Sequence, residues 1–231
     1  MIRRIAILLT MFLMLGCSAS AEDKRVLAAT TYPLYDIARM VGGEYVEAVY
    51  APEGGEEAAK AQIVLCVGGP GDAWTVDSDA MVLRAIDGLE LMDTEGNPAT
   101  EDTQADLLDT AVMTIPVHNM LCASALADAL IAADAEHAEE YRENLASYID
   151  QMIDLDARFR EAAAGGQRIA CADGSMRYFL REYELMYADD STAEAVVLST
   201  YDHPAEEDMQ TPYVQLMERN LSALLAASSN Q

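Results

Sequence analysis

The chain has 231 residues with 40 acidic and 14 basic side chains, which gives a formal net charge of −26 at pH 7. A surface of that charge repels phosphate backbones, so the composition argues against a nucleic-acid-binding protein. It attracts cations only non-specifically, and its simplest consequence is solubility.

The first seventeen residues have the pattern of a secretory signal peptide. Arg3 and Arg4 precede an apolar run over 5–15, and Cys17 follows at a cut site with small residues. The run has 11 residues, well short of the roughly 20 that a membrane-spanning helix needs. We therefore predict a bacterial lipoprotein signal over 1–17 with acylation of the Cys17 thiol; plain secretion is the alternative. Loss of the two arginines would change the net charge from −26 to −28.

Three cysteines lie beyond the signal and show neither a disulfide framework nor a metal-binding pattern. Cys66, Cys122 and Cys171 each lie in an apolar segment, and none belongs to a CxxC pair. Their number is odd, which makes a full set of disulfides impossible. We expect them to be small buried hydrophobic side chains.

Short apolar strands alternate with helices in the first half of the chain. A helix is predicted from Tyr32-Pro33 to Gly42-Gly43, because proline is favoured in the first turn of a helix and glycine at its end. The other predicted segments are strands over 26–31, 45–51 and 62–67, a Gly-Gly-Pro-Gly turn over 68–71, a helix over 77–86, a strand over 89–92 and a loop over 93–106. This alternation predicts a parallel α/β sheet.

A long amphipathic helix is the strongest structural signal in the chain. Apolar side chains recur at steps of three and four residues at Tyr141, Leu145, Tyr148, Met152, Leu155 and Phe159. With Asp134 as N-cap and Gly165-Gly166 as the stop, the helix would have about 30 residues and a length of roughly 45 Å. A coiled coil is the alternative, but a rigid strut between two lobes agrees better with the α/β pattern around it.

A small second lobe follows the strut. Its predicted elements are strands over 168–172 and 196–199 and helices over 176–183 and 211–227. The predicted fold class is therefore α/β, with two small lobes of parallel sheet joined by one long rigid helix. The predicted boundaries are 1–17 for the signal, 18–133 for the first lobe, 134–164 for the linking helix and 165–231 for the second lobe.

With this order of elements, the sequence resembles the metal-receptor lipoproteins of ABC importers for zinc and manganese. The likeness rests on five segments: VLAATTYPLYDIARMVGGEYVEAVYAP, AQIVLCVGGPGDAW, DTAVMTIPVHNMLCASALADALIAADAEHAEEYRENLASYIDQMIDLDARFREA, ADGSMRYFLREYEL and TPYVQLMERNLSALLAA. It implies that a divalent cation, Zn²⁺ or Mn²⁺, binds between two lobes and is delivered to a membrane permease. It also implies export and a lipid anchor on the outer face of the bacterial cell membrane, or a periplasmic location.

The resemblance also implies a metal site of three His and one carboxylate, a ligand set suited to such cations. Most of these positions differ in this chain. The loop of the first His is replaced by EGGEEAAK after Pro52, the second His position is Ala111, and the Trp that follows it in the family is Met113.

The remaining ligand positions leave three candidates. The third His position falls at or beside Asp173, for which a helix N-cap is the alternative role. The segment of the fourth ligand is shortened, and Asp189 or Asp190 substitutes if any residue does. His203 lies in the carboxylate-rich loop TYDHPAEED, for which a solvated loop is the alternative. The predicted metal ligands are therefore Asp173, Asp190 and His203.

Other polar residues are assigned structural roles. His118 and His137 fall on helices without a partner His four residues on, and the acidic loop with Glu53, Glu56 and Glu57 is expected to face solvent. The glycines over 68–71 lack the Lys-Ser/Thr of a phosphate-binding loop, so they predict a close-packed turn. No GxSxG or HExxH motif is present, and we expect no enzyme.

Two functions follow from these observations. The first is a substrate-binding lipoprotein of a zinc or manganese ABC importer. The second is a degenerate surface lipoprotein with the same fold, which no longer binds metal tightly and serves as an interaction or adhesion protein.

Overall fold

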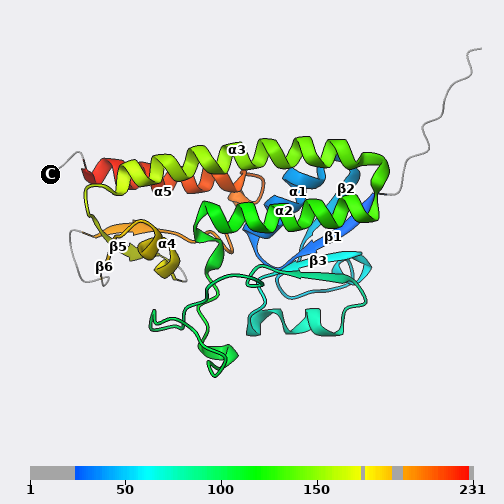
Figure 1. Cartoon of the computed structure of the whole chain (residues 1–231), viewed down its shortest axis with the longest axis horizontal. Coiled ribbons are helices and arrows are strands. Elements are labelled where there is room, and N and C mark those ends of the chain that lie inside the picture. The colour runs from blue at the N-terminus through cyan, green and yellow to red at the C-terminus, as the bar shows by residue number, and fades with distance from the viewer. Residues whose placement is uncertain (1–23, 173–174, 189–194, 229–231) are drawn as a thin grey trace, which may run out of the picture.

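The computed structural model of the protein describes residues 24–172, 175–188 and 195–228. Two parallel sheets lie below one long helix that runs along the length of the molecule (Figure 1). The first sheet lies under the N-terminal end of this helix and the second sheet under its C-terminal end. The predicted α/β class with parallel sheets and a long helix is confirmed.

The first sheet has four parallel strands in the order β2-β1-β3-β4. They are β1 (Arg25–Ala29), β2 (Val46–Tyr50), β3 (Ile63–Cys66) and β4 (Met81–Arg84). The register places Ala29 beside Tyr50 and Leu27 beside Ile63. Helix α1 (Tyr32–Gly42) follows β1, with proline in its first turn and Gly43 at its end in the left-handed region at φ 58°.

The helix predicted over 77–86 is wrong, because this segment contains strand β4. A 3₁₀ segment, η3 (Pro70–Asp77), precedes the strand. A short apolar run such as Ala80–Leu83 fits a helix and a strand equally well, and β4 lies at the sheet edge, where its exposure hides the alternation of a half-buried strand. The predicted strand over 89–92 is also absent: in that segment only Met92 forms an isolated bridge, to Pro98.

The predicted linking helix begins later than expected. Helix α2 (Pro116–Ala133) ends at Asp134, a 3₁₀ turn, η6 (Ala135–His137), follows, and α3 (Ala138–Ala163) then continues for 26 residues, about 39 Å. The Asp134 carboxylate accepts a hydrogen bond from the Tyr141 hydroxyl at 2.8 Å, so it braces the junction between the two helices.

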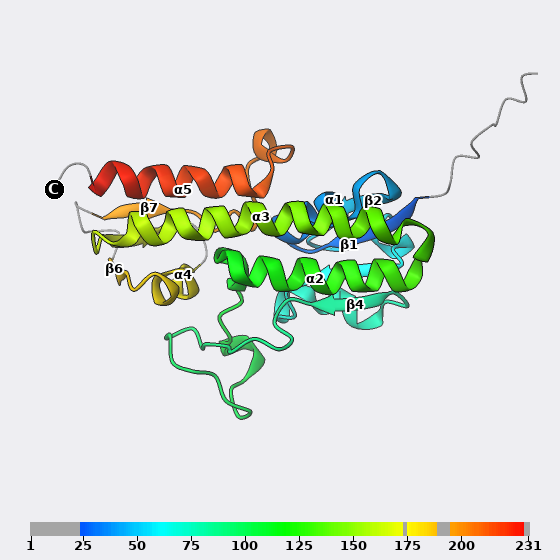
Figure 2. The ribbon, with the colours of Figure 1, turned by 45° about the horizontal axis from the view of Figure 1, so that its top comes forward.

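The apolar stripe of α3 is buried as predicted. Tyr141, Tyr148, Met152, Leu155 and Phe159 are all at most 2% exposed, and Leu145 packs at the edge of the same core. This core is shared with both sheets, because α3 contacts α1 and α2 at one end and α5 at the other (Figure 2). The stripe therefore holds the two halves of the molecule together through burial of apolar surface.

Helix α2 is long and apolar enough, by length and composition, to cross a membrane. Its buried residues include Ala123, Leu126, Ala127 and Leu130, and it packs against α1 and α3. This is the environment of a core helix.

The second sheet is smaller and also parallel. Its order is β6-β5-β7, with β5 (Arg168–Cys171), β6 (Met186–Tyr187) and β7 (Val196–Leu198). Helices α4 (Arg177–Glu182) and α5 (Tyr213–Ser228) accompany it. Strand β6 was not predicted, because two residues are too few to show any periodicity.

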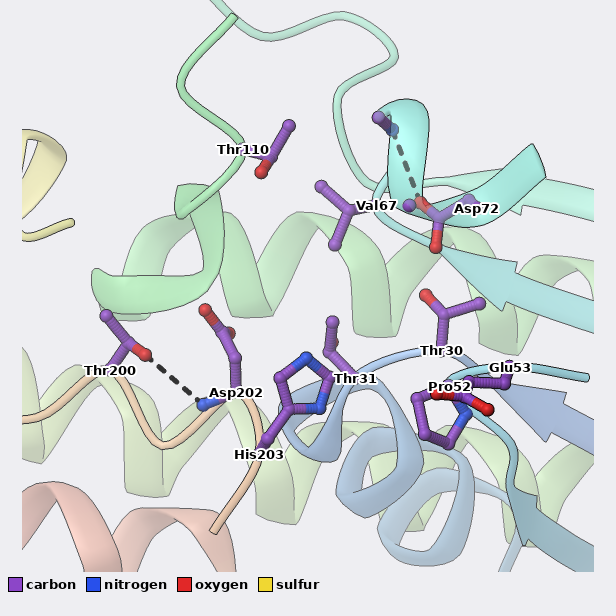
Figure 3. A pocket seen from close by; sticks show the side chains of 12 residues that line it. Thr30, Thr31, Pro52, Glu53, Val67, Asp72, Thr110, Thr200, Asp202 and His203 are labelled. Atoms are coloured by element: carbon purple, nitrogen blue, oxygen red, sulfur yellow. Dashed lines mark hydrogen bonds between the residues drawn. The ribbon is translucent and has the colours of Figure 1, made fainter. Parts of the chain in front are cut away.

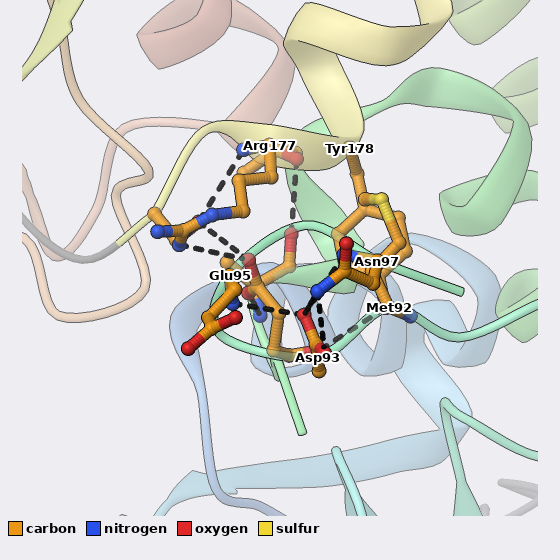
Figure 4. A network of polar contacts seen from close by, with 10 residues as sticks. Met92, Asp93, Glu95, Asn97, Arg177 and Tyr178 are labelled. Carbon is orange, nitrogen blue, oxygen red and sulfur yellow. Dashed lines mark hydrogen bonds and ion pairs between the residues drawn. The ribbon is translucent and has the colours of Figure 1, made fainter. Parts of the chain in front are cut away.

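Hydrogen bonds hold the irregular segment between β4 and α2 against helix α4, which accompanies the second sheet. The Tyr178 hydroxyl accepts a hydrogen bond from the Met92 amide at 3.0 Å and donates to the Asp109 carbonyl at 3.1 Å. The Asp109 carboxylate is buried and accepts a hydrogen bond from the Ser175 hydroxyl at 2.6 Å, with Arg177 3.4 Å away. Figure 4 shows this network around Arg177 and Tyr178. The two sheets are thus tied together on this side of the molecule.

Candidate functional site

A cavity of about 630 Å³ opens between segments that follow strands of both sheets. Ligands of parallel α/β sheets bind beyond the carboxyl ends of the strands, which is where these segments lie. The lining residues come after β1 (Thr30, Thr31), after β2 (Pro52, Glu53), after β3 (Val67, Gly69, Gly71, Asp72), before α2 (Thr110) and after β7 (Thr200, Asp202, His203).

The glycine-rich turn after β3 shapes one wall of the cavity. One carboxylate oxygen of Asp72 accepts hydrogen bonds from the amides of Gly68 and Gly69, at 2.7 and 3.2 Å. A side chain at Gly69 would bring its Cβ within 2.5 Å of Thr110, so glycine allows this loop to pack closely. The prediction of a close-packed turn is confirmed. The amides of Gly68 and Gly69 already donate to Asp72, so they are not available to bind a phosphate.

The segment after β7 forms the opposite wall. The backbone enters the left-handed region at Tyr201, with φ 55°, a conformation that is strained for an aromatic residue. The Tyr32 amide at the start of α1 donates to the Asp202 carbonyl at 2.8 Å, which holds this segment against the first sheet. Figure 3 shows Asp202 and His203 on this wall, across from Thr30 and Asp72.

A hydrogen-bond chain orients the His203 ring. The Tyr50 hydroxyl lies 2.6 Å from His203 Nδ1 and donates to the Asp202 carbonyl at 3.4 Å. The short contact at Nδ1 fixes the orientation of the His203 ring. Burial raises the pKa of Tyr50 to about 12, so the hydroxyl keeps its proton at neutral pH. An exposed imidazole that is held through Nδ1 leaves Nε2 for binding a metal ion.

Hydrogen bonds from two side chains of helix α1 hold the segment that leads from this wall into α5. The Tyr32 hydroxyl donates to the Thr211 carbonyl at 2.6 Å, and the Asp36 carboxylate accepts a hydrogen bond from the Tyr213 amide at 3.0 Å. Asp36 is 1% exposed, and its burial raises the pKa of the carboxyl to about 6, against the smaller opposing effects of the Tyr213 amide and Arg39. The position of Asp202 and His203 therefore depends on contacts made by α1.

The sequence-predicted ligands are only partly described by the structure. His203 lines the cavity. Asp173 and Asp190 lie outside the described residues, as does Cys17, so their roles stay predictions. Within residues 24–172, 175–188 and 195–228, no three His, Cys, Asp or Glu side chains are close enough together to hold a metal ion.

The other histidines have structural surroundings. His118 is buried with Nδ1 2.6 Å from the Val112 carbonyl, and burial lowers its pKa. His137 stacks on Tyr45 at 3.9 Å and lies 2.9 Å from the Asp134 carboxylate. The described cysteines are free thiols, with Cys66 buried and the other two half-buried.

Sequence reasoning missed several residues of the cavity. Glu53 was expected to face only solvent, and it is exposed, but it also lines the cavity. Asp72 and the threonines at positions 30 and 31 were not singled out. Glu53 follows the second strand, where the family that the sequence resembles has its first His ligand. This position in the chain was the one sequence signal that Glu53 lies at the site.

The comparisons with known proteins concern most of the chain. Residues 27–229 match the family described as zinc-uptake complex component A, periplasmic (ZnuA). No curated protein matches the sequence significantly.

Several solved structures share the fold. They include Zn(II)-bound AdcA of Streptococcus pneumoniae, at a TM-score of 0.69 and 16% identity over 89% of this chain and 58% of that chain. The metal-dependent lipoprotein YcdH of Bacillus subtilis has a TM-score of 0.71 at 16% identity, over 88% of this chain and 99% of its own. FpvC of Pseudomonas aeruginosa in complex with Mn²⁺ has a TM-score of 0.66 at 16% identity, over 90% and 99%. At such identities the likeness shows the fold alone, and the chain spans less than two thirds of AdcA.

Proposed function

The chain belongs to the family of periplasmic zinc-uptake components A, and on this premise we propose that it is the substrate-binding protein of an ABC importer for a divalent metal ion. Members of this family are solute-binding proteins and not enzymes. In the proposed role the ion binds in the cavity between the two sheets, and the loaded protein delivers it to a permease in the membrane.

The observation that carries the proposal is the cavity with His203 on its wall. The ring is oriented by its contact with the Tyr50 hydroxyl, and Glu53 and Asp202 line the same cavity. Nitrogen and carboxylate ligands bind zinc and manganese. Asp173 and Asp190 are proposed to complete the ligand set from the segments that follow β5 and precede β7.

Titration calorimetry of the purified protein with Zn²⁺ and with Mn²⁺ tests this function. We expect binding of one ion per chain with a dissociation constant below about 1 µM, which corresponds to roughly 8 kcal/mol. Binding should persist at high salt, because ligands in a cavity are screened less than surface charges. The described residues contain no cluster of three metal ligands, and the alternative function therefore has its own expected result. Millimolar, salt-sensitive binding would reflect only the acidic surface and would support the degenerate surface lipoprotein.

We also propose that the protein is anchored to the outer face of the cell membrane through acylated Cys17. The support is the sequence pattern before Cys17, which precedes the described residues. Cells that express the protein and are fed labelled palmitate should incorporate label into the wild-type chain and none into Cys17→Ala. Label on the variant would place the lipid elsewhere, and absence of label on both would favour a secreted protein.

A further inference from the structure

A second cavity lies beside the second sheet, away from the cavity with His203. Its volume is about 520 Å³, within the range of about 300–1,000 Å³ that is usual for small-molecule sites. It lies between helix α4 and the turn that carries Glu95, and strands β5 and β6 end at it with Cys171 and Tyr187. Among the described residues, the two cavities share no lining side chain.

Two arginines give this second cavity a positive charge, unlike the rest of the protein. Arg177 and Arg181 both line it, and they lie on one side of α4 because residues four apart in a helix are neighbours. The whole chain has 40 acidic and 14 basic side chains, yet Glu95 is the one acidic residue of the described lining. The local potential therefore favours an anion at this place.

The guanidinium group of Arg177 is held in place without using all of its donors. Its Nη1 lies 3.1 Å from the Ser175 hydroxyl and 3.4 Å from the Asp109 carboxylate, and the side chain is 40% exposed. A Cβ at Gly96 would lie 3.5 Å from Arg177 Cδ, so glycine lets the arginine stem pass along the turn. Figure 4 shows this side chain reaching from α4 toward the turn that carries Glu95. A guanidinium has five N–H groups, so the donors other than those of Nη1 are available to a guest.

The guanidinium group of Arg181 is exposed and lies 5.6 Å from the centre of the Tyr178 ring. In the part of the chain that the structure describes it has no acidic partner, and its hydrogen bond to the Glu90 carbonyl is long, at 3.5 Å. An arginine without an acidic partner is notable in a chain with so many carboxylates. Its planar fork of donors is free to bind the two oxygens of a carboxylate.

The remaining wall of the second cavity is apolar. Met176 and Leu180 lie at its buried floor, and the Tyr187 side chain is 64% exposed. An aromatic ring in contact with water presents apolar surface that a ligand can cover. A guest that matches both kinds of wall has an apolar body and one anionic group.

We propose that this second cavity binds a small organic carboxylate, with the carboxylate between Arg177 and Arg181 and the apolar body against Tyr187. Guanidinium groups make charge-assisted, bidentate hydrogen bonds to carboxylates. Phosphate offers similar oxygens but no apolar body, so it is the competitor that the experiment has to exclude. The inference is independent of the proposed function, since no metal ion takes part in it.

Saturation-transfer NMR with benzoate as the probe tests this inference. We expect the wild-type protein to bind benzoate with a dissociation constant of about 1 mM or below, and to bind the neutral analogue benzamide at least about tenfold more weakly. An excess of inorganic phosphate should displace no more benzoate than sodium chloride does at the same ionic strength.

Two substitutions at the second cavity should act with opposite signs. Arg181→Gln should weaken benzoate binding about tenfold, because it removes a charge-assisted pair of hydrogen bonds. Glu95→Gln should strengthen binding about threefold, because it removes a like charge near the carboxylate. Arg158→Gln is the control for net charge: Arg158 is 44% exposed on α3, where it pairs with Glu218 at 2.7 Å, and this variant should bind benzoate as the wild type does.

Three results would overturn the inference. They are absence of benzoate binding, equal binding of benzoate and benzamide, and equal effects of Arg181→Gln and Arg158→Gln. Displacement of benzoate by phosphate beyond the effect of chloride would also overturn it and would assign an inorganic anion to the cavity. None of these results bears on metal binding at His203, which is measured separately.

Discussion

Replacing Asp36 with asparagine is expected to remove a pH-dependent loss of stability of about 3 kcal/mol between pH 4 and pH 7. The Asp36 carboxyl is buried between α1 and α5, and burial raises its pKa to about 6 from the ordinary 3.8. The difference of about two pKa units, at 1.36 kcal/mol per unit, gives the magnitude. Asparagine keeps the oxygen that accepts the Tyr213 amide and cannot ionise.

The sign follows from proton binding. Between about pH 4 and pH 6 the folded protein holds the Asp36 proton more tightly than the unfolded chain does, so stability from this group is fully present below pH 4 and falls as the pH rises toward 6. Around this carboxyl, α1 contributes Arg39, α5 the Tyr213 amide and α3 the Tyr148 hydroxyl. Urea unfolding at several pH values gives the free energy of unfolding of both proteins, and their difference should grow from pH 4 to pH 7 and then stay constant.

An exposed aspartate provides the control. Asp128 lies on the solvent side of α2, and Asp128→Asn is the same substitution at an exposed position. The many other acidic groups contribute equally to all three proteins and cancel in the differences. If the free energies of unfolding of wild type and Asp36→Asn changed in parallel with pH, the prediction would be wrong, because ionisation of the Asp36 carboxyl would then not destabilise the folded protein.

The elements that the sequence predicted well are those with a periodic apolar face. The stripe from Tyr141 to Phe159 is buried because each of its residues recurs on one side of a helix, and the strands before Pro33 and Gly68 are short runs that end at turn residues. The segment at 81–84 was predicted wrongly because three apolar residues and an arginine at an exposed edge show no periodicity. The start of α3 was misplaced because Asp134 braces a junction between two helices and does not cap a single one.

The candidate site was harder to predict because its walls come from segments far apart in the chain. Glu53 and His203 follow strands of different sheets. The hydrogen bond from the start of α1 that holds the segment with His203 against the first sheet leaves no trace in any local sequence pattern. Thr30 and Thr31 have common side chains, and only their burial without a partner makes them notable. His203 could be identified because histidine is rare in this sequence, which has three in all.

Replacing His203 with alanine is expected to weaken metal binding at least a hundredfold, or about 2.8 kcal/mol. His203 is the one histidine among the described residues that line the cavity, and its Nδ1 contacts the Tyr50 hydroxyl, which leaves Nε2 for the ion. Loss of a nitrogen ligand leaves oxygen atoms alone, so Zn²⁺ should lose more affinity than Mn²⁺. Competition calorimetry with a chelator of known affinity measures both ions on the wild type and the variant.

Tyr50→Phe should produce a smaller effect on the same scale, about tenfold, because it removes the hydroxyl that orients the His203 ring and leaves the ligand in place. His137→Ala is the matched histidine control: its ring stacks on Tyr45 away from the cavity, so the variant should melt at a lower temperature and bind as the wild type does. The order of affinities should therefore be His137→Ala equal to wild type, then Tyr50→Phe, then His203→Ala. If His203→Ala bound zinc as tightly as His137→Ala, the ion would be held by residues other than those on this wall, and the ligand role of His203 would be excluded.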